Sequence, residues 1–452
     1  MAVKRIVRSH RRVTVPVSRG DNGVSQPIDQ FPSRHYRKGM TATPGIDPST
    51  PFRNRTDLDT AQLLAEAKDL LPEVVELRRL IHAEPEIGLD LPLTQAKVID
   101  ALEGLGLEVT TGDAVSSVVA TLTGDQPGPT LLLRGDMDAL PMPEDSGEPF
   151  SSTHDGAMHA CGHDSHVAML VGAARMLHAR RSELKGTVKF FFQPGEEGYH
   201  GARYCLEEGL LESPDVDAAF AIHITPNRPS GTLATRPGPM MAAADEVFIT
   251  VTGKGGHASA PHGAVDPIPV ACEIVTALQS HITRAVNAFK PAVLTIAKIK
   301  AGTTTNVIPE SAKMSGTLRT VDEKTRAAVH EGISQVATGI AAAHGCGAEV
   351  EIDHGYPVTI NDDEFAAFTV AVMGDLVGTE NVAIMDAPVM GAEDWSYVLQ
   401  QVPGSMAFLG VCPEGEVPRM AHACHSNRMR LDEDAMAVGV AAHAAVALSY
   451  LG

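Results

Sequence analysis

The sequence TLLLRGDMDALP, residues 130–141, joins a short apolar run to a cluster of polar side chains. Residues 130–133, 188–192 and 218–222 are almost wholly apolar, which is typical of strands buried on both faces of a parallel sheet. Between the first two runs, apolar residues recur at helical spacing from Val167 to Leu177. This alternation predicts an α/β fold with a mainly parallel sheet and helices on both faces.

Polar motifs follow these predicted strands. RGDMDALP follows the first strand, QPGEEG follows the second, and His223 ends the third. Ligands of open α/β sheets bind outside the carboxyl ends of the strands. We therefore expect these motifs to converge on the loop MHACGHDSH, residues 158–166.

A second pattern begins near residue 247. It predicts a strand over 247–251, a helix over 267–289, strands over 293–299 and 313–319, a helix over 323–343 and a strand over 348–352. The order β, α, β, β, α, β is the ferredoxin-like α+β plan. We predict a catalytic domain over 56–240 and 354–452, interrupted by an inserted domain over 241–353.

Charge and composition narrow the class of protein. The chain has 36 basic and 56 acidic residues, so we expect neither nucleic acid nor an anionic membrane as partner. No segment approaches the roughly 20 uninterrupted apolar residues of a membrane-spanning helix. Residues 1–55 hold eleven Lys or Arg and three acidic residues, which predicts a disordered basic arm, although Met40 offers an alternative start. The six cysteines lack framework spacing, so we expect reduced thiols and a cytoplasmic protein.

The loop MHACGHDSH is dense in metal-ligating side chains. His159, Cys161 and His163 alternate, so in extended backbone they point the same way. A loop that opens onto a helix could present any two of them to one ion, and a thiolate with imidazoles suits Zn²⁺. The plainer alternative is that some of them are only polar loop residues.

The adjacent carboxylates Glu196 and Glu197 follow a buried strand within a glycine-flanked turn. Such a turn can aim one carboxylate at a metal ion and the other at its bound water, as metal-assisted hydrolysis requires. The alternative is an exposed acidic turn. Asp136 and Asp138 could ligate a metal, orient a ligand histidine or close a turn.

Two further histidines are candidates. His223 is either a ligand or a hydrogen-bonded core residue, and His425 competes with His422 and Cys424 in the sequence HACHSN. In the inserted domain, the glycine-rich turn around His257, with Asn306 and Arg319, would suit a site that polarises a carbonyl and clamps a carboxylate. Without the other motifs, the simpler explanation of these three residues is preferred, namely that they cap loops and that the arginine lies on the surface.

The ordered motifs resemble one family over about residues 60–450. They are RGDMDALP, MHACGHDSH, FQPGEEG, the strand ending in His223, GKGGHASAPH, TTTNVIP, GAEDWSYVLQQVPG and HSN. The chain resembles the two-metal amidohydrolases that include hippurate hydrolase, N-acyl-amino-acid aminoacylases and auxin-conjugate hydrolases, which are related to zinc carboxypeptidases. The resemblance implies two divalent ions, zinc foremost with manganese or cobalt as alternatives. It also implies that the inserted domain is a lid that commonly mediates dimer formation.

The resemblance also implies roles for individual residues. Glu196 would be the general base and acid, and His257 would stabilise the oxyanion, often in the partner subunit's site. Asn306 and Arg319 would hold the substrate carboxylate, and Asp138 would support a ligand from behind. The implied metal ligands are Cys161, His163, Glu197, His223 and His425, and which group bridges the ions stays open. SNRM follows His425 where relatives usually have SPRF, and Cys424 precedes it.

The expected activity is hydrolysis of the amide bond in N-acyl amino acids or similar small conjugates. The alternative with the same machinery is a metallo-carboxypeptidase or dipeptidase. Two further alternatives are a non-catalytic metal-binding protein and an amidase with Cys161 as nucleophile beside His163.

Overall fold

The structure, a computed structural model, describes Phe52 and residues 57–452. The basic arm predicted over 1–55 lies outside the described residues, apart from Phe52. Phe52 packs edge-on against Phe365, with the ring centroids 5.1 Å apart. It also lies against Phe368 and Tyr450.

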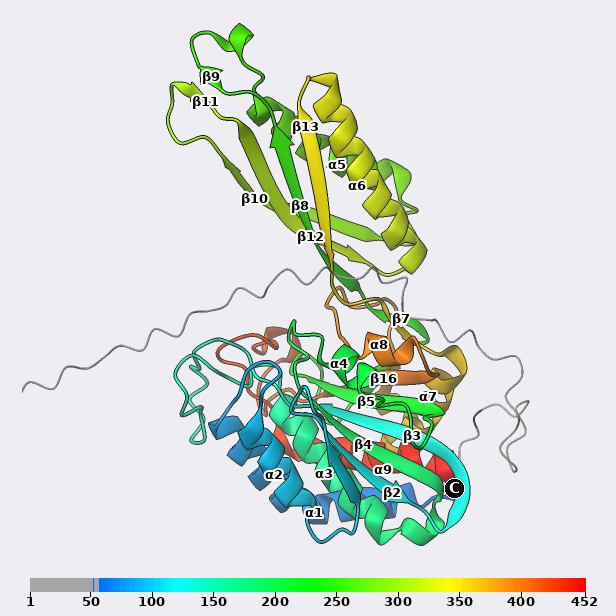
Figure 1. Cartoon of the computed structure of the whole chain (residues 1–452). Helices are drawn as coiled ribbons and strands as arrows, with labels where there is room; N and C mark the ends of the chain where they lie inside the picture. Colours follow the sequence, from blue (N-terminus) through cyan, green and yellow to red (C-terminus); the bar gives the residue numbers. More distant parts are fainter. Residues whose placement is uncertain (1–51, 53–56) are drawn as a thin grey trace, which may run out of the picture. The chain divides into compact units, whose positions relative to one another are not determined.

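An eight-stranded sheet forms the centre of the larger predicted domain (Figure 1). Its strand order is β1-β2-β4-β3-β5-β16-β6-β15. The central pairs β4–β3, β3–β5 and β5–β16 are parallel, and antiparallel pairs flank them. The strands are β1 (Glu108–Thr111), β2 (Val118–Thr123), β3 (Gln126–Asp136), β4 (Lys185–Gln193), β5 (Ala218–Thr225), β6 (Leu233–Thr235), β15 (Val382–Ile384) and β16 (Gly404–Gly410). The predicted α/β class is confirmed.

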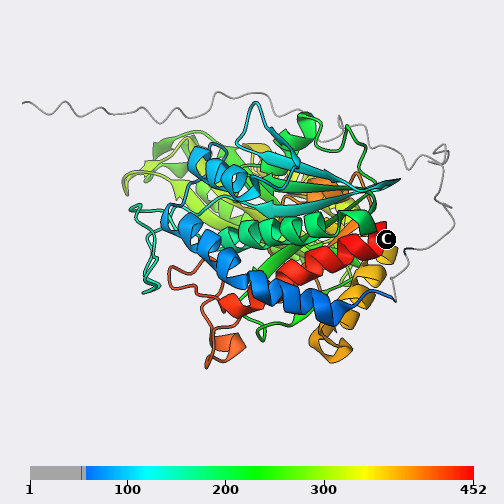
Figure 2. The ribbon, with the colours of Figure 1, turned by 90° about the horizontal axis from the view of Figure 1, so that it is seen from below.

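The apolar strands are buried because alternate side chains enter two separate cores. Leu131, Leu133 and Phe190 belong to the core on one face, whereas Leu132 and Phe191 belong to the core on the other. The larger core is covered by α1 (Thr60–Ala83), α2 (Pro92–Leu102), α3 (His163–Ala179), α7 (Asp363–Val377) and α9 (Met436–Leu451). Figure 2 looks onto this layer, where α1, α3 and α9 pack together. The shorter α4 (Gly201–Glu207) and α8 (Ser396–Leu399) cover the opposite face.

The C-terminal helix is apolar along most of its length. The segment Glu433–Leu451 is long and apolar enough to span a membrane by length and composition, although charged and polar residues interrupt it. In the structure 89% of its apolar window is buried, and α9 packs against α1, α3 and α7. Its alanines and its glycine allow these helices to approach closely. A helix that is surrounded by other elements in the core is apolar on all sides, and α9 is such a helix.

The inserted domain has a separate antiparallel sheet in the order β10-β12-β8-β13 (Figure 1). Along β8, Val247, Ile249 and Val251 face the core that α5 and α6 complete. The elements are β8 (Ala243–Thr252), α5 (Pro267–Ala285), β10 (Ala292–Ala301), β12 (Ser311–Thr320), α6 (Glu323–Ala343) and β13 (Gly347–His354). This is the predicted ferredoxin-like order, although α5 ends before residue 289. The domain limits at 240 and 353 stay predictions.

Candidate metal centre

A glycine shapes the turn that presents the first two candidate ligands. Helix α3 begins at His163, and Gly162 before it has a φ of 79°. A Cβ on Gly162 would lie 2.6 Å from Cγ1 of Ile224, so both the backbone conformation and the space require glycine. The turn places Cys161 and His163 at the carboxyl ends of the central strands, as the strand order predicted.

The turn after β4 is held by a buried carboxylate. The backbone N–H groups of Glu196 and Glu197 donate to the two oxygens of Asp138, each at 2.9 Å. The hydroxyl of Tyr356 donates to the carbonyl oxygen of Glu196 and accepts the N–H of Gly198 at 2.7 Å. These bonds fix the backbone from which the paired carboxylates project.

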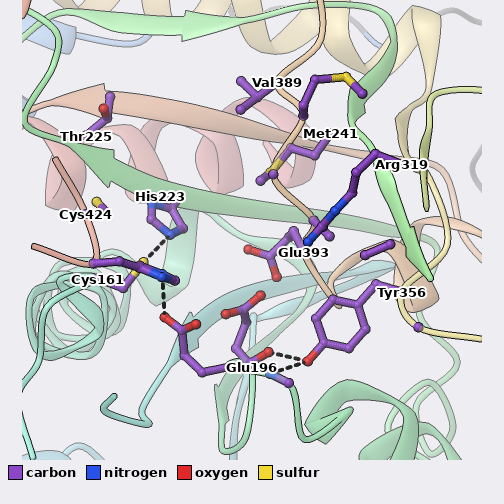
Figure 3. Close-up of a pocket in the computed structure, with 18 of the residues that line it drawn as sticks. Cys161, Glu196, His223, Thr225, Met241, Arg319, Tyr356, Val389, Glu393 and Cys424 are labelled. Atoms are coloured by element: carbon purple, nitrogen blue, oxygen red, sulfur yellow. Dashed lines mark hydrogen bonds and ion pairs between the residues drawn. The ribbon is translucent and has the colours of Figure 1, made fainter. Parts of the chain in front are cut away.

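The structure brings the five predicted metal ligands together. Figure 3 shows two of them, Cys161 and His223, beside each other. Sγ of Cys161 lies 3.4 Å from Nε2 of His223. Oε1 of Glu197 lies 3.1 Å from Nε2 of His425 and 3.9 Å from Nε2 of His163. Two overlapping sets, Cys161 with His163 and His223, and Cys161 with Glu197 and His425, each have ligand atoms within 4.8 Å of one another. The five residues come from four separate segments.

The donor atoms fit a metal ion of the zinc type. Within the described chain, Nε2 of His163 and Oε1 of Glu197 are buried and make no hydrogen bond of good geometry. Nδ1 of His223 donates to the carbonyl oxygen of Ile224 at 2.6 Å, which leaves Nε2 free to ligate. Nδ1 of His163 lies 3.4 Å from Oδ1 of Asp138, which is an ion-pair distance. Sulfur, nitrogen and oxygen donors in one cluster suit borderline divalent cations.

The site has a strongly negative local potential. Burial alone would lower the pKa of His163, but the charges of Asp136, Asp138 and Glu197 raise it to about 10. A divalent cation would therefore be electrostatically favoured at this position.

Burial raises the pKa of Glu196 well above its ordinary value, and the nearby charges of Glu393 and Glu197 add to the effect. A carboxyl group with a raised pKa can both accept and return a proton near neutral pH.

Other residues of the loop MHACGHDSH have different surroundings. Nδ1 of His166 donates to Asp136 at 2.5 Å and its Nε2 accepts the N–H of Ile224 at 2.9 Å, so both nitrogens are in use. The carboxylate of Asp164 accepts from Arg78 and His82. His159 is buried and has no hydrogen-bond partner among the described residues.

A pocket of about 860 Å³ opens beside the ligand cluster. Arg319 reaches it from β12, on the side opposite Cys161 and His223 (Figure 3). The lining includes five apolar side chains, three of which are methionines: Met241, Met385, Val389, Met390 and Phe408.

The structure does not bring every predicted residue into this pocket. His257, in β9 (Gly256–His257), pairs with Val307 of β11 (Val307–Ile308), and Asn306 immediately precedes that strand. Both His257 and Asn306 are exposed, and neither lines the pocket. Arg319 is thus the one of the three that reaches the pocket from within the same chain.

Sequence reasoning missed a buried charge network behind Glu196. The guanidinium of Arg134 lies 2.8 Å from Glu393 and 2.8 Å from Asp136, and it donates to Gln193 at 3.0 Å. Glu393 also lines the pocket. The motif GAEDWSYVLQQVPG contained a signal for Glu393, because two ordinarily exposed carboxylates, Glu393 and Asp394, directly precede a tryptophan there.

The family comparison agrees with this geometry. The model of peptidase family M20/M25/M40 matches residues 132–449, a range that contains all five candidate ligands and the whole inserted domain. The chain belongs to peptidase family M20/M25/M40. It is therefore a metal-dependent hydrolase, as the sequence predicted.

The matches between this chain and its relatives cover nearly the full length of each relative. N-acetylcysteine deacetylase of Bacillus subtilis is 39% identical over 368 residues, 81% of this chain and 93% of that protein. Thermostable carboxypeptidase 2 of Saccharolobus solfataricus is 37% identical over 393 residues, 86% of this chain and 98% of that protein. The crystal structure of B. subtilis YXEP, described as a dinuclear metal-binding peptidase of the M20 family, is 35% identical with a TM-score of 0.73; the match covers 85% of this chain and 99% of YXEP.

Proposed function

We propose that this M20 protein hydrolyses the amide bond of N-acyl amino acids and releases a carboxylic acid and an amino acid. Two divalent ions would be held by Cys161, His163, Glu197, His223 and His425. Zinc is the metal we expect, with manganese and cobalt as alternatives, because sulfur, imidazole and carboxylate donors accept all three. The description of YXEP as dinuclear supports two ions rather than one.

The observation that carries the substrate class is the position of Arg319. Its guanidinium faces the pocket opposite the ligand cluster (Figure 3) and makes no hydrogen bond to the described part of the chain. An N-acyl amino acid carries its carboxylate two bonds from the amide nitrogen, and a guanidinium binds a carboxylate with paired hydrogen bonds. The substrate would therefore span the pocket with its amide at the metals.

The chemistry divides between the ions and the protein. The bound metals supply Lewis acidity, which lowers the pKa of water and polarises the carbonyl. Glu196 takes the proton from the attacking water and returns it to the departing amine nitrogen. The raised pKa of Glu196 makes it competent for both steps. Asp138 holds the Glu196 backbone in place.

The apolar wall indicates the nature of the acyl group. Met241, Met385 and Met390 have flexible, polarisable side chains, and Val389 and Phe408 complete a surface without charge. Such a wall favours an apolar aryl or alkyl group over a charged one, because burying an unpaired charge there is costly.

We also propose that the protein forms a homodimer through the inserted domain. His257 and Asn306 lie far from the pocket lining of their own chain, on the β9–β11 pair. To stabilise the oxyanion and bind the carboxylate, they would have to reach the site of a second copy. Mixing two inactive variants, Glu196→Gln and His257→Ala, should then restore part of the activity in the mixed dimer.

A carboxypeptidase is the second candidate. The 37% identity to thermostable carboxypeptidase 2 favours it, and a peptide also presents a terminal carboxylate for Arg319. Turnover of N-benzoyl and N-acetyl amino acids should be compared with dipeptides on one preparation of known metal content. Faster turnover of dipeptides than of all N-acyl amino acids would refute the first assignment.

The role of Glu196 is tested by Glu196→Gln. We expect kcat to fall by about 10²–10⁴-fold with the metal content unchanged, because only proton transfer is lost. Glu331→Gln, an exposed residue of α6, is the matched control and should retain full activity. Near-normal turnover by Glu196→Gln would refute the role.

A further inference from the structure

Two cysteines from distant parts of the chain meet in the metal centre. Cys161 precedes α3, and Cys424 lies in the segment between β16 and α9. Sγ of Cys161 lies 3.4 Å from Nε2 of His223, and Sγ of Cys424 lies 4.0 Å from the carbonyl oxygen of Ile224, so both thiols lie beside the same end of β5. Figure 3 shows both sulfur atoms on the same side of the pocket, beside His223. Cys161 is a proposed ligand, whereas no role has been assigned to Cys424.

A backbone hydrogen bond holds the two segments that carry these cysteines next to each other. The N–H of His425, directly after Cys424, donates to the carbonyl oxygen of Ala160, directly before Cys161, at 2.8 Å. The two cysteines therefore flank one inter-segment hydrogen bond, and their side chains start from adjacent peptide units. A disulfide needs Cα atoms about 4.4–6.8 Å apart and Cβ atoms that face each other. The two thiols already lie on the same side of the pocket, where such a bond can form.

We propose that Cys161 and Cys424 form a reversible disulfide when the metal centre is empty, which prevents the centre from taking up metal. The disulfide removes the thiolate of Cys161 from the proposed ligand set, so the inference rests on the proposed function for its effect on hydrolysis. Bound metal protects the pair because it occupies the sulfur of Cys161. The pair would thus couple enzyme activity to both metal supply and peroxide.

The oxidant is a hydroperoxide, and hydrogen peroxide is the simplest example. One thiolate attacks a peroxide oxygen, the O–O bond breaks, and a sulfenic acid and one water are formed. The second thiol attacks the sulfenic sulfur, the S–S bond forms, and a second water leaves. The two thiols lose two electrons and two protons, and the peroxide receives both. A dithiol reductant reverses the step by thiol–disulfide exchange.

The location favours this reaction over other oxidations. Both cysteines line the pocket, so a small peroxide can reach them from the solvent. The other four cysteines, Cys205, Cys272, Cys346 and Cys412, do not line this pocket. A partner thiol in contact captures the sulfenic acid before further oxidation.

The test uses the full-length chain, stripped of metal with a chelator and treated with hydrogen peroxide. We expect the loss of two of the six thiols. Mass spectrometry should show the Cys161 and Cys424 peptides linked and lighter by two hydrogens. Zinc bound per chain should fall and recover after dithiothreitol. Zinc-loaded protein should keep all its thiols. These readouts do not depend on hydrolysis, so they decide the inference even if every candidate amide fails as a substrate.

Variants separate the disulfide from general oxidation. Cys424→Ser should form no linked peptide, and Cys161 should then proceed to a sulfinic acid that dithiothreitol does not reverse. Cys272→Ser removes an exposed thiol outside the pocket and should still form the link. The inference is overturned if metal-free wild-type protein forms no such link. It is also overturned if Cys161 links to another cysteine, or if zinc-loaded protein oxidises at the same rate.

Discussion

Asp138 provides the sharpest test of how the metal centre is held in place. Its carboxylate accepts two backbone N–H groups at 2.9 Å, from Glu196 and Glu197, and lies 3.4 Å from Nδ1 of His163. In Asp138→Asn, one carboxylate oxygen becomes an NH₂ group, which cannot accept an N–H. One charge-assisted hydrogen bond is lost, and the imidazole of His163 loses its anionic partner.

The magnitude follows from the bonds that are lost. A hydrogen bond to a charged group contributes about 1.5–3 kcal/mol, which corresponds to about 10–150-fold in an equilibrium constant. Because the lost bonds position Glu197 and His163, we expect this cost to appear as weaker zinc binding. This agrees with the loss of about 10–100-fold in metal affinity that is typical when a residue hydrogen-bonded to a metal ligand is mutated. The kcat at saturating zinc should also fall, because the N–H of Glu196 is one of the two that Asp138 accepts.

Competition with a fluorescent chelator would measure the zinc affinity, and kcat and KM would be determined with excess zinc. Asp217→Asn is the matched control, because Asp217 accepts the N–H of Thr130 at 2.8 Å at the opposite end of β3. Unchanged zinc affinity in Asp138→Asn, or an equal loss in Asp217→Asn, would refute the reasoning.

Three further predictions concern other parts of the molecule. Burial alone would lower the pKa of His82, but the charge of Asp164 and the hydrogen bonds of His82 to Asp164 and Glu144 raise this pKa to about 9. The resulting stabilisation is present below the ordinary pKa of about 6.5 and is lost as pH rises through 9. The unfolding free energy of wild type minus His82→Gln should therefore fall by about 3 kcal/mol over this range in urea titrations, and a flat difference would contradict it. Gly162→Ala should cost about 1–3 kcal/mol of stability and weaken zinc binding, whereas Gly263→Ala, which has open space around it, should be nearly neutral; equal effects would refute the steric argument. Arg319→Met should raise KM for N-acyl amino acids by about 10–100-fold without affecting the corresponding uncharged amides, and equal loss on both would remove Arg319 from carboxylate binding.

Much of the fold could be predicted because its signals are local. The apolar runs of β3, β4 and β5 and the helical spacing after His163 are legible in short windows. The ferredoxin-like order of the insert was equally legible. The burial of α9 was harder to predict, because composition alone does not distinguish a core helix from a membrane-spanning one.

The site could be predicted only in part from the sequence. Spacing allowed His159 as readily as Cys161, and the choice of Cys161 depended on family resemblance. The structure supplies a physical reason, because Cys161 lies 3.4 Å from His223 whereas His159 is buried away from the pocket lining. Arg134 was invisible as a functional residue because its partner Glu393 is far away in the sequence.

The sequence by itself determined the strands, the helices and which residue types could bind metal, since periodicity and local motifs act over a few residues. Tertiary structure alone decided which of those residues meet. Parallel strands end at one edge of the sheet, so segments around residues 161, 196, 223 and 425 converge there. The inserted domain brings Arg319 to the opposite side of the pocket, and the return of the chain places Cys424 on the same side of the pocket as Cys161. These contacts depend on topology, because no local signal records a neighbour that is more than a hundred residues away.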